Sequence, residues 1–333
     1  MKELVKQLSQ TYGPSGHEEQ IREVIKSLVE PYCDELTTDT LGNLIAHKKG
    51  PGAKIMLAAH MDEIGVMITD VDDQGFLRFT RVGGLSPHLL LGQRMVFANG
   101  VVGVFGHEKL DDIKDLKFDK MYLDIGARSK EEALNRVNLG DVAVFDRELA
   151  AAGDILTGKA LDNRAGCAVL IKTLQELAAG PNDIYAVFTV QEELGTRGAK
   201  TSAYGIEPDL GLAVDVTLVG DTPKAPTNAV CLGKGPTIKV KDALVMAHPQ
   251  VKQALVEVAK SNAIPYQFEI LDTGGTDAGP IHLSKSGVRS GGVSVPCRYV
   301  HTPTEMVSLT DLEHAVSLLK AFLVTPLETG IGV

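Results

Sequence analysis

Two adjacent carboxylates, Glu192 and Glu193, follow a run of apolar and β-branched residues at 184–190 that is typical of a buried strand. Adjacent carboxylates repel each other, so a sequence that keeps both indicates a nearby cation or a role in proton transfer. An acidic surface loop is the alternative interpretation of this stretch taken alone. Other parts of the chain decide between the two.

Further residues of metal-binding types follow other apolar runs. His60, Asp215 and His301 each come at or near the end of such a run, and Asp162 lies where a loop becomes a helix. Ligands of open α/β sheets bind beyond the carboxyl ends of the strands. These side chains are therefore expected to meet at one edge of a sheet.

Together with Glu193, these residues make a set of two imidazoles and three carboxylates, which suits Zn²⁺, Co²⁺ or Mn²⁺. If Asp162 bridges two ions, each ion receives one histidine and two carboxylates, and open positions remain for water. Two ions ~3.5–4 Å apart polarise a carbonyl group and generate hydroxide as the nucleophile at neutral pH. Glu193 would then bind metal, and Glu192 would act on the water as general base.

Taken one at a time, these residues have plain structural explanations. A histidine at a strand end is commonly a loop residue, Asp162 is also placed to cap a helix, and Asp215 to form a turn. Asp62 is either a solvated loop charge or the residue that hydrogen-bonds the far nitrogen of His60 and fixes its tautomer. The recurrence of ligand types at equivalent positions favours the metal site.

Alternating helix and strand patterns surround these residues. Ser15 and Glu18 predict a capping box at the start of a helix that ends before Pro31. The unbroken apolar run that ends at His60 predicts a strand buried on both faces. After residue 154 the alternation predicts a largely parallel sheet covered by helices. The expected strands are 184–190, 210–216 and 290–296, and the expected helices are 163–181, 249–262 and 310–323.

Residues 67–154 have a different pattern. Short alternating strands replace helical periodicity, and Asn99-Gly100 lies between two apolar runs, which is a strong hairpin signal. We therefore predict an α/β fold with a mixed, largely parallel sheet covered by helices and an inserted small all-β domain. Residues 1–66 and 155–333 would form the catalytic domain, and the insertion would be barrel-like.

The composition of the chain excludes several functional classes. Its 333 residues are enough for two domains, and 44% apolar with 23% charged residues is ordinary for a soluble globular protein. A net charge of −10 disfavours nucleic acid as a partner. The N-terminus lacks the apolar core of a signal peptide, no run is long enough to span a membrane, and the four cysteines show no CxxC spacing. We therefore expect a cytoplasmic protein with no nucleic-acid or membrane partner.

Six sequence blocks occur in order along the chain: AAHMDEIG (58–65), ALDNRAG (160–166), VQEELGTRGA (190–199), AVDVT (213–217), GGTDAG (274–279) and RYVHTPTE (298–305). They resemble the signature blocks of the co-catalytic metallo-aminopeptidases of metallopeptidase family forty-two. That family includes tetrahedral, deblocking and glutamyl aminopeptidases and cellulase M-like proteins. The resemblance implies a co-catalytic zinc-peptidase fold, and assembly through the inserted domain into dimers or tetrahedral dodecamers.

The resemblance also implies roles for single residues. It gives two ligand groups, His60, Asp162 and Asp215 for one metal ion and Asp162, Glu193 and His301 for the other. It makes Glu192 the acid/base and Asp62 a supporting residue. Thr276 and Asp277 would border the site as well as cap a helix.

We predict a dinuclear-metal aminopeptidase that hydrolyses the N-terminal residue of short peptides. Endoglucanase activity is an alternative, with Glu192 and Glu193 flanking the scissile bond, but the chain has no Trp and only 5% aromatic residues to stack on sugars. A deacylase of N-acyl amino acids, which needs the same metals, is a further alternative. A non-catalytic scaffold protein is disfavoured, because it would be expected to lack some of the metal ligands, whereas this set is complete. The sequence leaves open whether an acidic or a large apolar N-terminal residue is preferred, which metal is native, and how many subunits assemble.

Overall fold

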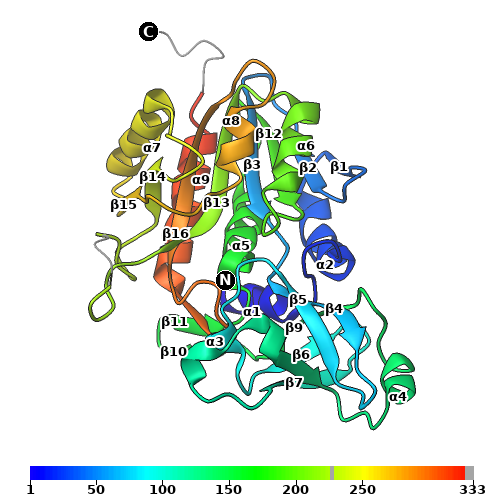
Figure 1. Cartoon of the computed structure of the whole chain (residues 1–333). Helices are drawn as coiled ribbons and strands as arrows, with labels where there is room; N and C mark the ends of the chain where they lie inside the picture. The colour runs from blue at the N-terminus through cyan, green and yellow to red at the C-terminus, as the bar shows by residue number, and fades with distance from the viewer. Residues whose placement is uncertain (226–228, 327–333) are drawn as a thin grey trace.

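The computed structural model describes residues 1–225 and 229–326, and Figure 1 shows a large helix-covered sheet with a smaller β-barrel below it. The strands of the sheet follow the order β1 (Glu35–Thr38), β2 (Leu44–Lys48), β12 (Asp183–Thr189), β3 (Lys54–His60), β13 (Leu210–Leu218), β16 (Arg289–Arg298), β17 (Glu305–Ser308), β11 (Ile155–Gly158) and β10 (Ala150–Ala152). Beside this path, β14 (Thr237–Lys241) pairs with β16, and β15 (Gln267–Ile270) pairs with β14.

The centre of the sheet is parallel. β12, β3, β13 and β16 run in the same direction, whereas β2 and β17 join this group antiparallel. The carboxyl ends of the central strands therefore meet at one edge, where His60 ends β3 and the loops after β12 and β16 begin. The candidate ligands were expected at this edge from the sequence.

Two layers of helices cover the sheet. One layer consists of α1 (Lys2–Gln10), α2 (Glu19–Val29), α5 (Leu161–Glu176), α7 (Pro249–Ser261) and α9 (Leu309–Leu323), and the other of α6 (Arg197–Ile206) and α8 (Ala278–His282). In β3, Ile55 and Leu57 pack in the first layer, while Met56 and Ala58 pack in the second. All four are buried, which confirms the predicted strand with two covered faces. Burying such side chains stabilises the fold by about 1.5–3 kcal/mol each for the larger ones.

The smaller part of the molecule is a closed six-stranded barrel. Its strands, in order around the barrel, are β4 (Gly65–Val71), β5 (Leu77–Val82), β8 (Met121–Asp124), β7 (Val102–His107), β6 (Arg94–Phe97) and β9 (Val142–Phe145). β6 and β7 form the hairpin expected at Asn99-Gly100, where Gly100 has a φ of +85°. The predicted fold class, a mixed α/β fold with an inserted all-β part, is confirmed. The division into a catalytic domain and a domain at 67–154 stays a prediction.

The start of α2 differs from the prediction. The helix begins at Glu19, and Glu18 occupies its N-cap position without a side-chain hydrogen bond to the helix. The expected capping box is therefore wrong. Both side chains are instead buried: Ser15 bonds to Asp62, and Glu18 bonds to Gln191 as well as to the nearby Gly16. Among the described residues, no helix is long and apolar enough to cross a membrane.

Candidate metal centre

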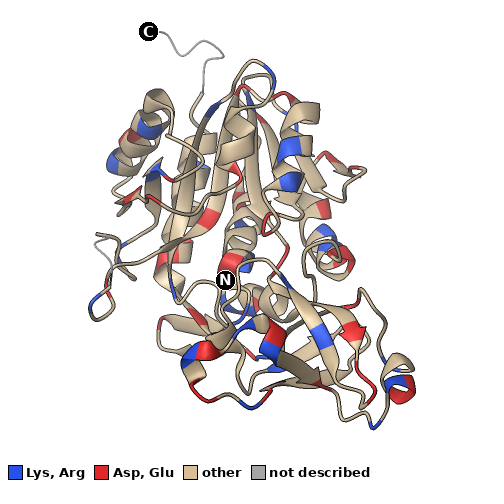
Figure 2. Ribbon diagram, in the orientation of Figure 1, with Lys and Arg blue, Asp and Glu red and all other residues tan. Residues whose placement is uncertain are grey.

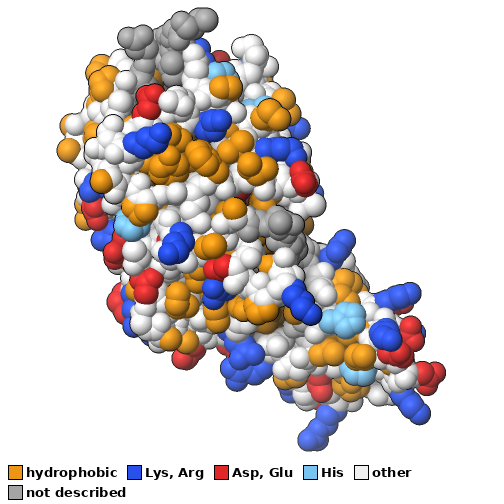
Figure 3. All heavy atoms as spheres, turned by 90° about the vertical axis from the view of Figure 1, so that its left-hand side faces the viewer, with side chains coloured by type: hydrophobic (Ala, Val, Ile, Leu, Met, Phe, Trp, Pro, Cys, Tyr) orange, Lys and Arg blue, Asp and Glu red, His pale blue; other side chains and the backbone are white. Residues whose placement is uncertain are grey.

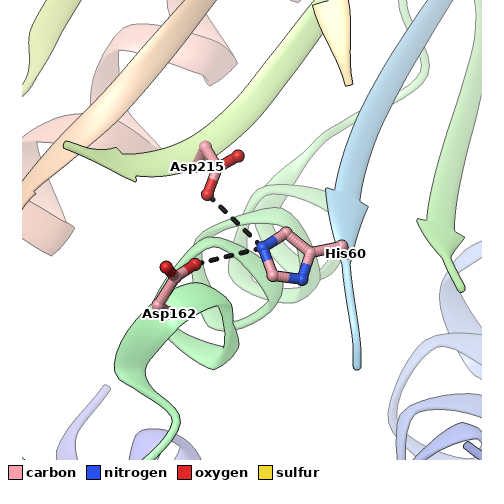
Figure 4. A group of neighbouring side chains, drawn as sticks. All are labelled: His60, Asp162 and Asp215. Carbon is pink, nitrogen blue, oxygen red and sulfur yellow. Dashed lines mark hydrogen bonds and ion pairs between the residues drawn. The ribbon is translucent and has the colours of Figure 1, made fainter. Parts of the chain in front are cut away.

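The first predicted ligand group lies at the end of β3. His60 is almost fully buried, and its Nε2 atom lies 3.1 Å from Asp162 Oδ1 and 3.7 Å from Asp215 Oδ1, as Figure 4 shows. Asp215 extends from the neighbouring strand β13, and Asp162 lies at the start of α5. One ligand atom from each residue lies within 4.8 Å of the others, so the three side chains are close enough to hold one ion.

The second predicted group contains the same aspartate. His301 Nε2 lies 3.3 Å from Asp162 Oδ2 and 3.1 Å from Glu193 Oε1, and these three residues also satisfy the 4.8 Å limit. Asp162 thus faces one group with Oδ1 and the other with Oδ2. A carboxylate placed in this way suits a bridge between two cations. Figure 2 shows acidic residues gathered on the ribbons at this end of the sheet, next to the barrel.

The charges of these residues fit divalent cations. Burial, together with the charges of neighbouring carboxylates, raises the pKa of Asp215 and of Glu192 well above the usual range, although His60 opposes the shift. Burial disfavours the charged imidazole of His301, but its hydrogen bonds with Asp162 and Glu193 raise its pKa to about 11. The two ligand groups thus have an excess of carboxylates over imidazoles, and the raised pKa of Asp215 reflects how strongly burial and repulsion disfavour its charge without a cation. Divalent cations with nitrogen and oxygen ligands would balance that excess.

Asp62 is buried rather than solvated, so the loop-charge interpretation is wrong. Its carboxylate lies 3.4 Å from His60 Nδ1, on the side of the ring away from the other ligands. It also accepts hydrogen bonds from the backbone amides of Glu192, at 3.0 Å, and Glu193, at 3.2 Å. Burial disfavours its charge, but His60, the hydroxyl of Ser15 and the amide of Glu192 lower its pKa. Asp62 therefore connects β3 to the loop that contains the two glutamates.

Sequence analysis missed Glu305, the first residue of β17. This buried carboxylate accepts a hydrogen bond at 2.9 Å from the backbone amide of Asp162 and another at 2.9 Å from that of His301. It thereby fixes the backbone of two candidate ligands without facing them as a ligand. Its place at the end of the block RYVHTPTE was the only signal in the sequence.

A cavity of about 520 Å³ opens beside the candidate ligands. Glu192 and Thr276 line it, together with Gly84 from the barrel. A Cβ atom at Gly84 would lie 2.5 Å from Nδ1 of His301, so only glycine permits this close approach. The barrel therefore contributes part of the wall around the site.

The expected helix cap at Thr276 and Asp277 is not formed. Asp277 lies at the N-cap of α8 but makes no side-chain cap, and its Oδ2 atom accepts a bond of 2.5 Å from Thr189. Thr276 donates to Asp242 at 3.3 Å instead. Thr276 does border the cavity, as the resemblance implied.

At one edge of the mixed α/β sheet, two histidines and two carboxylates lie around one shared aspartate, an arrangement that defines a metal-dependent hydrolase. Residues 42–318 match the M42 glutamyl aminopeptidase family, and the chain belongs to this family. It is therefore a metallo-aminopeptidase, as the sequence blocks indicated.

Known proteins resemble the chain over nearly its whole length. A putative aminopeptidase of Acetivibrio thermocellus is 56% identical over 320 residues, which cover 96% of this chain and 97% of the relative. The structure of an aminopeptidase from the archaeon Desulfurococcus kamchatkensis has a TM-score of 0.94 at 42% identity, with 97% and 94% of the two chains covered. The TET1 peptidase of Pyrococcus horikoshii, which can assemble into a tetrahedron or a large octahedral shell, has a TM-score of 0.87 at 34% identity, with 97% and 98% covered.

Proposed function

We propose that this chain removes one residue at a time from the free N-terminus of short peptides, using two divalent metal ions held by the two ligand groups. The observation that supports this most is the placement of Asp162, whose two carboxylate oxygens face different groups. Zn²⁺ or Co²⁺ suits this ligand set best, and Mn²⁺ also fits it. When bound, the ions supply a Lewis-acid centre that polarises the scissile carbonyl and lowers the pKa of a water molecule.

The chain's own residues would divide the remaining work. His60 and Asp215 would bind one ion, and Glu193 and His301 the other. Glu192 lines the cavity without belonging to either ligand group. Its carboxylate would accept the proton of the attacking water and then give a proton to the leaving amine nitrogen.

A free α-amine is the expected recognition element of the substrate. Its positive charge complements the carboxylates that line the cavity, whereas an N-acetyl group removes that charge and adds bulk. We expect N-acetylation of a test peptide to slow release of its first residue by about 100-fold or more, because buried polar groups reject a substrate that leaves them unpaired. The measurement compares one peptide with its acetylated form.

The same assay separates the alternative activities. A deacylase would prefer the acetylated peptide, so faster cleavage of that form would contradict the proposal. Glycoside hydrolysis is tested with soluble cellulose. Among the described residues that line the cavity, none is Phe, Tyr or Trp, so sugar stacking has no support there. Chelator-sensitive sugar release that is lost in Glu192→Gln would overturn the peptidase assignment.

We also propose that the chain forms a homo-oligomer through the barrel. Val102 and Val104 of β7 are each 43% exposed, although both are large apolar residues. Replacing both with lysine should reduce the mass measured by light scattering towards 35.5 kDa, because an interface core excludes unpaired charges.

The matched control for this prediction is Phe268→Lys on β15, a strand at the edge of the large sheet. Phe268 is 46% exposed, and Figure 3 shows the face of the molecule on the β15 side, where hydrophobic side chains gather. Dissociation by Phe268→Lys alone would mean that the subunits meet through the α/β part. Retention of two ions per chain in the barrel variant would show that its site remains folded. A cytoplasmic location is a further proposal, supported by four free cysteines.

A further inference from the structure

The loop that contains the two glutamates has an unusual backbone. Gln191, directly before Glu192, has a φ of +53°, a left-handed conformation that residues with a side chain seldom adopt. Such a conformation persists where surrounding contacts fix it. The contacts around Gln191–Glu193 therefore decide where the side chain of Glu192 points.

Three consecutive amides of this loop are bound by buried carboxylates. Glu18 Oε1 accepts a hydrogen bond of 3.1 Å from the backbone amide of Gln191. Asp62 accepts the amides of Glu192 and Glu193, as described above. The backbone of the loop is thus fixed residue by residue from two other segments.

One of these segments is the N-terminal stretch Ser15–Glu18. Ser15 Oγ donates to Asp62 Oδ2 at 2.5 Å, which orients the carboxylate that binds the loop. Glu18 Oε1 also accepts the amide of Gly16 at 2.8 Å, so the same oxygen joins the stretch to Gln191. Both side chains are about 3% exposed, and water therefore competes little for these bonds.

The chain just before this stretch is bonded to the ligand region. The buried Arg164, two residues after Asp162, donates to the carbonyls of Leu8, at 2.5 Å, and Thr11, at 2.8 Å. The same guanidinium donates to Met61 at 2.8 Å, next to His60. The chain leading into this stretch and the segment next to His60 are therefore bonded to the same buried arginine.

We infer that Ser15 and Glu18 are positioning residues, which act through Asp62 and the amide of Gln191 to aim the carboxylate of Glu192 into the cavity. Both residues lie outside the 42–318 range that matches the family. The inference rests on the proposed function only in taking Glu192 as the general base. Neither residue is expected to touch the substrate or the metal ions.

The test measures kcat, KM and metal content in single variants. Ser15→Ala removes the donor to Asp62, and Glu18→Ala removes the acceptor for Gln191. Each should lower kcat about 10- to 100-fold, with KM and two bound ions per chain unchanged. Ser15→Thr and Glu18→Gln keep a donor and an acceptor, so each should stay within about threefold of the parent kcat. Glu19→Ala, at the exposed neighbour, is the control and should have no effect.

A double variant separates positioning from general stability. If Glu18 acts through Glu192, then Glu18→Ala combined with Glu192→Gln should be no slower than Glu192→Gln alone. Full additivity of the two losses would overturn the inference, as would parental kcat in both alanine variants. If Glu18→Ala does not fold, Ser15→Ala, which removes one hydroxyl, decides the question by the same comparison with Glu192→Gln. A parent enzyme that cleaves no peptide would instead contradict the proposed function.

Discussion

Glu192→Gln is expected to lower kcat on a free peptide by about 10²–10⁴-fold while both metal ions stay bound. The amide has nearly the shape of the carboxylate but cannot accept the proton of the attacking water. The substitution leaves the backbone amide of residue 192 and its hydrogen bond to Asp62 unchanged, so the loop should keep its conformation. Single-turnover kinetics and metal analysis of the same preparation give the two quantities.

Glu193→Gln is the matched control for this substitution, because it makes the same chemical change one residue further on. Glu193 belongs to the second ligand group, so its variant should lose metal as well as activity. Full metal content with surviving activity in Glu192→Gln would remove Glu192 from the role of general base. Loss of metal in Glu192→Gln would make it a ligand instead.

Asp162→Asn should leave at least one of the two metal sites empty and should remove most of the activity. A neutral amide is a poor bridge between two dications, since the bridging carboxylate offsets charge from both. The backbone amide of residue 162 still reaches Glu305 in this variant, so the loop itself is retained. Metal analysis after dialysis measures the loss directly.

Asp272→Asn is the control for this second prediction, because Asp272 is an exposed aspartate whose ion-pair partner, Lys241, lies outside both ligand groups. It should keep both ions and full activity. Two tightly held ions in Asp162→Asn would exclude the bridging role, whatever the effect on turnover.

The sequence was sufficient to predict the parallel centre of the sheet and the residues at its edge. The run at 55–59, directly before His60, is apolar at every position. Such a run is typical of a strand that is covered on both faces, and all five residues are buried. Parallel strands bring their carboxyl ends to one edge, so His60, Asp215 and the loop of Glu193 had to approach each other. His301 approaches the same edge because it lies in the loop directly after β16, the next strand of the parallel group. The proposed roles of these residues still await the experiments above.

The supporting contacts were beyond prediction because they are tertiary. Ser15 and Glu18 have the spacing of a local capping box, yet burial against Asp62 and Gln191 gives both side chains other partners. Glu305 has no pattern around it that indicates two amide bonds to distant loops. Local sequence patterns cannot report which segments a fold brings next to a side chain. The approach of Gly84 to His301 was hidden for the same reason.

If the proposed function is right, removal of the N-terminal residue needs two metal ions per chain, with Asp162 as a ligand common to both groups. The most direct test titrates chelator-treated enzyme with Zn²⁺ or Co²⁺ while release of the first residue of an unblocked peptide is recorded. Activity should rise until two ions are bound per chain and should stay constant afterwards. Full activity in the chelated enzyme, or a plateau at one ion per chain, would contradict this expectation.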